Sequence, residues 1–118
     1  MYYYYLTKEM GYTIKHKVWI ETDNASFLGN GRVRLLKTID ELGSLSKAAK
    51  QLNISYKKAW DLIKSVNDGS DKPITTTVTG GNGGGGMQLT PYGKKMIAQF
   101  EQLNAQATSF INQQEFKT

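Results

Sequence analysis

Apolar residues recur at helical spacing in the first half of the chain and predict a helix over residues 32–42. The positions that share one side of this helix are Leu35, Leu36, Ile39 and Leu42. Gly43 follows directly and is placed to end the helix, because glycine readily takes the left-handed conformation in which many helices terminate.

Two short helices are predicted next. Ser44 or Ser46 can cap the first, at about 47–52, and Ser55 can cap the second, at about 56–66, because a serine oxygen accepts a free N–H of the first turn. The second helix has an apolar face made by Ala59, Ile63 and Val66, with Leu62 at its edge.

β-Branched and aromatic residues indicate the strands. Residues 15–21 form the first run, and runs at 73–79 and 87–90 flank the glycine-rich segment 80–86, which is the pattern of a strand hairpin. Pro91 then starts a long helix, at a position where proline is tolerated. The order strand, three helices, hairpin and helix predicts a mainly α fold with a small β component.

The last helix carries apolar residues that alternate in steps of four and three, as in the seam of a coiled coil. These residues are Met96, Phe100, Leu103, Ala107 and Phe110, and Ile97 widens the stripe. We predict that they form a dimer interface. The alternative is that this face only covers the core of a single chain.

Composition narrows the possible functions. The 118 residues suit one domain, and the net charge of +5 with a pI of about 9.4 favours a polyanionic partner, nucleic acid first. The lack of cysteine excludes disulfides, thiol catalysis and thiolate metal sites. With His16 as the single histidine and no metal-ligand cluster, we expect no enzyme, no cofactor and no metal. No run is apolar enough to span a bilayer and no signal peptide is visible, so the expectation is a cytoplasmic protein without a membrane partner.

The two short helices are predicted to form a helix-turn-helix. Ala48 and Ala49 supply the small residues that let such helices approach closely. The N-terminal tip of the second helix enters the major groove of DNA in this motif, where lysine and serine can bond base edges or phosphates. The candidate DNA contacts in the helices are Ser44, Ser46, Ser55, Tyr56, Lys57, Lys58, Trp60, Asp61 and Lys64.

These candidates have plainer alternatives. A lysine-rich helix face is usually only solvated, although the pair Lys57 and Lys58 favours contact with DNA. Trp60 can meet a thymine methyl group or belong to the core. Asp61 can accept from cytosine or orient Lys57 one turn earlier.

The predicted hairpin fits a wing, because glycines let a backbone lie close to phosphates. The candidate contacts there are Thr79, Gly81, Asn82 and Gly83, and the alternative is a loop without a contact. The glycine run also matches the dinucleotide pattern G-x-G-x-x-G, but that site needs the glycines between a strand and a helix. The run lies between two predicted strands, so we reject a dinucleotide site.

Several segments together resemble the N-terminal winged-helix domain of ModE-type molybdate-responsive regulators, and LysR-type regulators share the more general pattern. The matching segments are Lys17-Val-Trp-Ile-Glu21, Gly31-Arg-Val-Arg-Leu-Leu36, Gly43-Ser-Leu-Ser-Lys-Ala-Ala49, Ile54-Ser-Tyr-Lys-Lys-Ala-Trp-Asp61, Thr79-Gly-Gly-Asn-Gly-Gly-Gly-Gly86 and Leu89-Thr-Pro-Tyr-Gly93. The resemblance covers about residue 15 to the end of the chain.

The resemblance implies a bacterial homodimer that binds a palindromic operator in double-stranded DNA. It implies a winged helix-turn-helix core at 12–90 and a long C-terminal dimerisation helix at 91–116, within one domain. Regulators of this family that sense molybdate carry a further oxyanion-binding domain, for which a chain ending at Thr118 has no room, so molybdate binding is in doubt here. The rival function is a winged helix that contacts only proteins.

Overall fold

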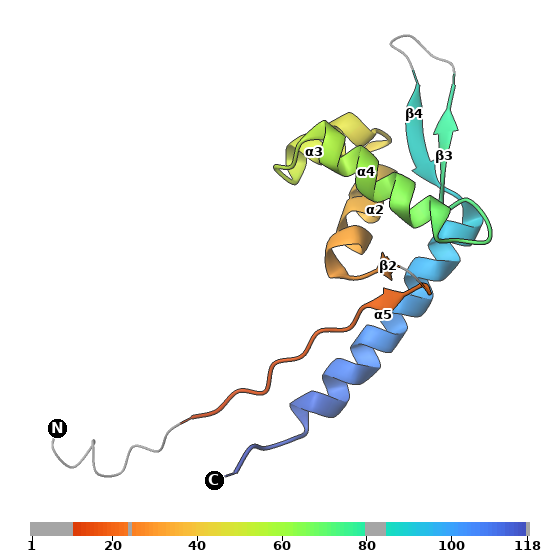
Figure 1. Cartoon of the computed structure of the whole chain (residues 1–118). Helices are drawn as coiled ribbons and strands as arrows, with labels where there is room; N and C mark the ends of the chain where they lie inside the picture. The colour runs from red at the N-terminus through yellow and green to blue at the C-terminus, as the bar shows by residue number, and fades with distance from the viewer. Residues whose placement is uncertain (1–10, 24, 80–84, 118) are drawn as a thin grey trace, which may run out of the picture.

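Eight elements make up the fold in the computed structural model, which describes residues 11–23, 25–79 and 85–117. In chain order they are β1 (Ile20–Glu21), β2 (Ser26–Leu28), α2 (Asn30–Leu42), α3 (Leu45–Gln51), α4 (Tyr56–Asp68), β3 (Thr75–Val78), β4 (Gly86–Leu89) and α5 (Pro91–Asn112) (Figure 1). The arrangement is a winged helix-turn-helix followed by a long helix, mainly α with a small β component, as predicted.

The helix ends follow from local chemistry. Ser44 caps α3 by accepting from the N–H of Lys47 at 3.1 Å, so of the two serines predicted as caps it is Ser44 that acts. Thr90 caps α5 in the same way, with Pro91 in the first turn. Gly43 ends α2 at φ 69°, the left-handed conformation that its position predicts.

The core lies among α2, α3, α4 and the hairpin β3–β4. The side chains predicted to be buried on α2 and α4 are buried, apart from the half-buried Leu42 and Leu62. The first half of α5 completes the core, whose largest fully buried side chains are Phe100, Leu28, Leu35, Leu36, Ile39, Ile63, Ile74 and Val66. A single apolar cluster therefore holds the helix-turn-helix, the hairpin and the start of α5 together.

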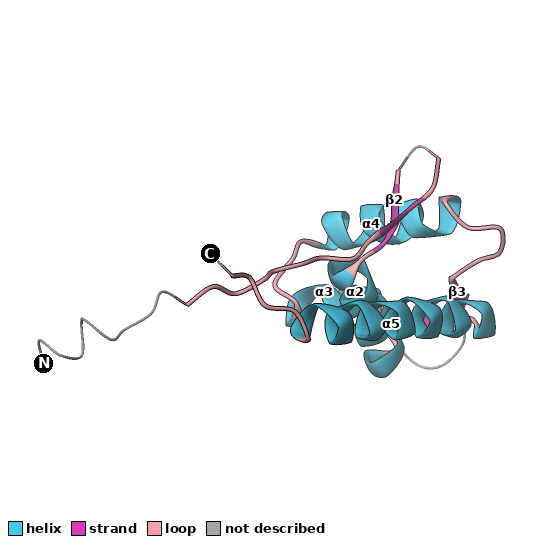
Figure 2. Cartoon of the chain, turned by 90° about the horizontal axis from the view of Figure 1, so that it is seen from below, coloured by secondary structure: helices cyan, strands magenta, loops and turns pink. Residues whose placement is uncertain are grey.

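The N-terminal strand is shorter than predicted. Of residues 15–21, only Ile20–Glu21 form a strand, and they pair with β2, which the sequence pattern did not predict. Residues 11–19 run alongside the second half of α5 (Figure 2), and the ring of Tyr12 lies 5.2 Å from that of Phe116, just beyond the end of this helix. Residues 15–19 thus form no strand, and His16 Nε2 lies 3.0 Å from the Thr108 hydroxyl of α5.

The hairpin β3–β4 is antiparallel, with a register from Thr75↔Leu89 to Val78↔Gly86. It projects beyond the helices, while α5 leads from its base in the opposite direction (Figure 1). The predicted strands at 73–79 and 87–90 are confirmed, the first with narrower bounds and the second beginning and ending one residue earlier.

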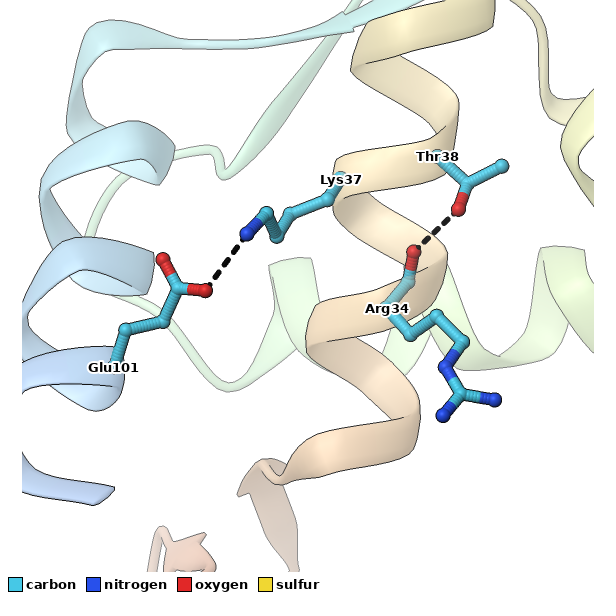
Figure 3. Close-up of polar contacts among 4 residues, drawn as sticks. All are labelled: Arg34, Lys37, Thr38 and Glu101. Carbon is cyan, nitrogen blue, oxygen red and sulfur yellow. Dashed lines mark hydrogen bonds and ion pairs between the residues drawn. The ribbon is translucent and has the colours of Figure 1, made fainter. Parts of the chain in front are cut away.

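An ion pair joins α5 to α2. The Lys37 Nζ lies 2.7 Å from the Glu101 Oε2, and both side chains are about half exposed (Figure 3). One residue further along α2, the Thr38 hydroxyl is buried and donates to the Arg34 carbonyl oxygen at 2.7 Å. The middle of α5 is therefore tied to α2, and only its second half extends past the core.

Candidate nucleic-acid interface

The turn between α3 and α4 is tight, and a left-handed residue and a backbone hydrogen bond define its conformation. Asn53 takes φ 57°, a left-handed conformation that asparagine tolerates, and the N–H of Ile54 bonds the Ala49 carbonyl oxygen at 3.0 Å. Ala48 and Ala59 are wholly buried, so α3 and α4 approach closely where they cross. The predicted helix-turn-helix is confirmed.

The outer face of α4 is open to solvent. Ser55 caps this helix through the N–H of Lys58 at 3.0 Å, as predicted, and Tyr56 beside it is 58% exposed. Trp60 is 46% exposed and therefore does not belong to the core. Seven of the candidate contacts gather on or beside this face: Ser55, Tyr56, Lys57, Lys58, Trp60, Asp61 and Lys64.

Two ion pairs of i, i+4 spacing run along this face. Lys57 Nζ lies 3.0 Å from Asp61 Oδ2, which is the orienting contact considered for Asp61. Lys64 Nζ lies 2.8 Å from Asp68 Oδ2, and this hydrogen bond, together with the negative charge of Asp68, raises the pKa of Lys64. In contrast, Lys58 forms no ion pair with any of the described residues.

The second strand of the hairpin is bonded to the end of α2. The N–H of Leu89 donates to Asp40 Oδ1 at 3.0 Å, and the N–H of Met87 donates to the Gly43 carbonyl oxygen at 3.1 Å. β4 is thus fixed along one edge by β3 and along the other by α2.

The first strand is bonded to the end of α4 through Asn67. Its Oδ1 accepts from the N–H of Ile74 at 2.7 Å and from the N–H of Thr75 at 3.2 Å, and its Nδ2 donates to the Thr75 hydroxyl at 3.0 Å. The sequence pattern predicted neither the contacts of Asn67 nor those of Asp40.

The remaining candidates lie elsewhere. Ser44 is half-buried as the cap of α3, and Ser46 is exposed in the first turn of that helix. Thr79 is exposed directly after β3, whereas Gly81, Asn82 and Gly83 fall outside the described residues.

The apolar residues of α5 divide into a buried group and a more exposed group along the length of the helix. Ile97 and Phe100 are 4% and 1% exposed and belong to the core of their own chain. Leu103 and Phe110 are 51% and 62% exposed, and Met96 and Ala107 are half-buried. One chain by itself therefore leaves the residues at 103 and 110 uncovered.

Neither a metal-binding cluster nor a membrane-spanning helix is found in the part of the chain that the structure describes. His16 is exposed and its Nε2 lies 3.0 Å from the Thr108 hydroxyl. The described residues hold no group of three or more acidic or histidine side chains of the kind that binds a metal ion. None of the described helices is both long and apolar enough to cross a membrane.

A closely packed helix-turn-helix with a strand hairpin beside it defines the class of winged helix-turn-helix proteins. Residues 31–94, more than half of the chain, match the model of the family described as "Bacterial regulatory helix-turn-helix protein, lysR family". The chain belongs to this family, whose members are DNA-binding transcription regulators. A family of regulators fits the expectation that the chain is not an enzyme.

Several curated relatives of this chain carry the name ModE. The chain is 39% identical to the molybdenum transport protein ModE of Azotobacter vinelandii over 79% of its length, and 46% identical to the DNA-binding transcriptional dual regulator ModE of Escherichia coli over 61%. It covers 34% and 28% of those proteins, so it spans about a third of the length of such relatives. The crystal structure of ArgP from Mycobacterium tuberculosis aligns with a TM-score of 0.47 at 20% identity, over 70% of this chain and 30% of that one.

Proposed function

We propose that this protein is a sequence-specific regulator that places α4 in the major groove of double-stranded DNA. The observation that carries the proposal is the outer face of α4, where exposed lysines and aromatic rings surround a capped N-terminus. A packed helix-turn-helix holds this face in place, as major-groove readout requires. The E. coli relative, which its name calls a DNA-binding transcriptional dual regulator, supports the same function.

The residues of this face take distinct roles in the proposal. Lys57 and Lys58 bond phosphates or guanine acceptors, and Tyr56 offers its hydroxyl to a phosphate or a base edge. Trp60 presents an apolar ring edge to a thymine methyl group or a sugar. The hairpin, including the candidates Thr79, Gly81, Asn82 and Gly83, approaches the flanking backbone as a wing.

We also propose that two copies bind a palindromic operator as a homodimer joined through α5. Met96, Leu103 and Phe110 recur every seven residues, and the last two are exposed apolar side chains that a partner helix can cover. Ile97 and Phe100 support this interface from within the monomer core. The two copies of α4 then sit about 34 Å apart, one turn of DNA.

The test is a salt titration of duplex binding. Lys57→Ala with Lys58→Ala removes two cations from the proposed contact face, so affinity for a duplex selected from random DNA falls. The salt slope becomes shallower by about 0.9 for each phosphate that the variant no longer neutralises. The matched control is Lys94→Ala with Lys95→Ala, which removes the same charge from adjacent exposed lysines of α5.

DNA reading and the rival function, contact with proteins alone, give different results in this measurement. A DNA reader loses affinity steeply as salt rises, and the α4 pair costs much more than the α5 pair. Equal losses in both double variants contradict the role of α4. Failure of the unaltered protein to bind any duplex favours the protein-contact function instead.

A further inference from the structure

We propose that Asp40 and Asn67 are positioning residues that set the angle between the recognition helix α4 and the wing β3–β4. They thereby fix the distance between the major-groove contact and the flanking-backbone contact on DNA. This inference rests on the proposed DNA binding. It names the two side chains that join α4 and the wing into one rigid DNA-binding surface.

The bond from Asp40 secures the outer edge of the wing. In an isolated two-stranded hairpin, β4 has one edge of free N–H groups. Here the N–H of Leu89 goes to the carboxylate of Asp40, 49 residues earlier in the chain, at 3.0 Å. A hydrogen bond to a charged acceptor is stronger than a neutral one, and Asp40 is half-buried, which shields this bond from water.

Asn67 makes the corresponding bond on the other strand. It lies in the last turn of α4 and uses both of its polar atoms on residues 74 and 75, where β3 begins. Its three contacts span 2.7 to 3.2 Å. Each strand of the wing is thus held near its base by one side chain, Asn67 from α4 and Asp40 from α2.

Because these bonds lie at the base of the hairpin, they affect the position of its far end. The loop end of the hairpin projects beyond the helices (Figure 1). β4 is also held by the bond from the Met87 N–H to the Gly43 carbonyl oxygen, and a four-residue strand is about 13 Å long. A tilt of about 20° at its base moves its far end by about 5 Å. That displacement exceeds the tolerance of a hydrogen bond to phosphate, so the wing reaches its proposed site only while its base is held.

The experiment compares two double variants on a duplex that the unaltered protein protects. Asn67→Ala with Asp40→Ala removes the side-chain bonds of both residues and leaves the backbone bond from Met87 to Gly43. Asn67→Asp with Asp40→Asn keeps a side-chain acceptor at each position and leaves the net charge unchanged, so it is the conservative control. The readout is hydroxyl-radical footprinting together with the salt slope of binding.

We expect the alanine pair to keep the protection centred on α4 and to lose the protection flanking it. Its salt slope becomes shallower by about 0.9 for each phosphate that the wing no longer reaches, although removing Asp40 makes the chain more positive. The control variant keeps both regions of protected DNA, the one centred on α4 and the one flanking it, which are called the two patches below. A purely structural role would instead weaken the two patches together.

Three outcomes overturn the inference. The first is an alanine pair with the same two-patch footprint as the unaltered protein, and the second is a parallel loss of both patches in a variant that melts normally. The third is an unaltered protein that protects no duplex, which overturns the proposed function as well. If the alanine pair does not fold, Asp40→Ala against Asp40→Asn makes the same comparison at one position.

Discussion

Each of two lysines on the outer face of α4 has a carboxylate one turn later. The pairs Lys57–Asp61 and Lys64–Asp68 have the same spacing and similar distances, 3.0 and 2.8 Å. Exposed pairs of this kind add little to stability, because water and salt screen them. These pairs instead affect how the lysines meet DNA, because each carboxylate orients its lysine and reduces the attraction of that lysine for any phosphate.

Asp61→Asn tests this effect at one residue. Removing the carboxylate beside Lys57 frees a full positive charge, so binding to random duplex becomes about two- to threefold tighter at low salt. The free energy of unfolding changes by less than about 0.5 kcal/mol, the usual contribution of such a pair. Competition binding against random DNA and thermal melting measure the two effects.

Asp68→Asn is the matched control, because it breaks the equivalent pair at the far end of α4. Both substitutions raise the net charge equally, so a difference between them reports distance from the helix tip. Weaker binding of the Asp61 variant to random duplex would show that the carboxylate helps binding instead of restraining it.

Single residues differed in how well the sequence predicted them. The cap at Ser55 and the left-handed Gly43 were predicted because their partners lie within four residues. Asp40 was not, because its partner Leu89 is 49 residues away and nothing in a local pattern marks that pairing. The candidate contacts on α4 were found because one helix collects them, and their contact with DNA stays a prediction.

At the scale of elements, the start of α5 packs directly on the loop that leads into the wing. Gly93 is buried in the first turn of α5, and a Cβ at this position would collide with the Ile74 carbonyl oxygen. The same carbonyl accepts the N–H of Thr90 at 2.9 Å. Glycine is therefore required here for close approach and not for an unusual φ.

Gly93→Ala is expected to lower the free energy of unfolding by about 1–3 kcal/mol, because the added methyl group overpacks a backbone contact. Gly31→Ala is the control, since it lies in α2 with no atom within 4 Å of an added Cβ. Its expected change is less than about 1 kcal/mol and stabilising, because alanine favours helices. Urea unfolding of both variants checks the prediction, and equal effects would contradict the close approach at Gly93.

Elements with a strong period were the ones that the sequence predicted. All four helices and both strands of the hairpin are confirmed, with ends that shift by a few residues. β1 is the end of the strand predicted at 15–21, whereas its partner β2 was not predicted, because three residues are too few for alternation to be recognised. Residues 15–19 have strand composition, but whether a strand forms depends on a neighbouring strand that the local sequence does not encode.

At the scale of the whole molecule, the two halves of α5 have different surroundings. Ile97 and Phe100 in the first half pack into the core, while Leu103 and Phe110 in the second half are left exposed by the same chain. The helix pattern revealed the seven-residue repeat but not this division, because the apolar stripe continues along both halves. Burial in the folded chain separates the proposed partner surface from the core.

Leu103→Glu tests the proposed dimer. Placing a charge at the centre of the seam raises the dissociation constant of the dimer by at least about tenfold, equivalent to 1.4 kcal/mol. The fold is kept, because the leucine is already 51% exposed in one chain. Ala105→Glu is the control, since an exposed residue two positions later points about 200° away around the helix. Sedimentation velocity measures both, and a Leu103 variant that stays dimeric like the control would exclude this seam.

In the proposed dimer, the seven-residue repeat on α5 also limits which operators can be read. A partner helix that slides by one repeat along the seam moves by about 10.5 Å, the length of seven helical residues. Because base pairs are stacked about 3.4 Å apart, a slide of that length along the DNA axis corresponds to a change of about three base pairs between half-sites. We therefore expect the register between Met96, Leu103 and Phe110 of the two copies to set the half-site spacing in steps of whole heptads.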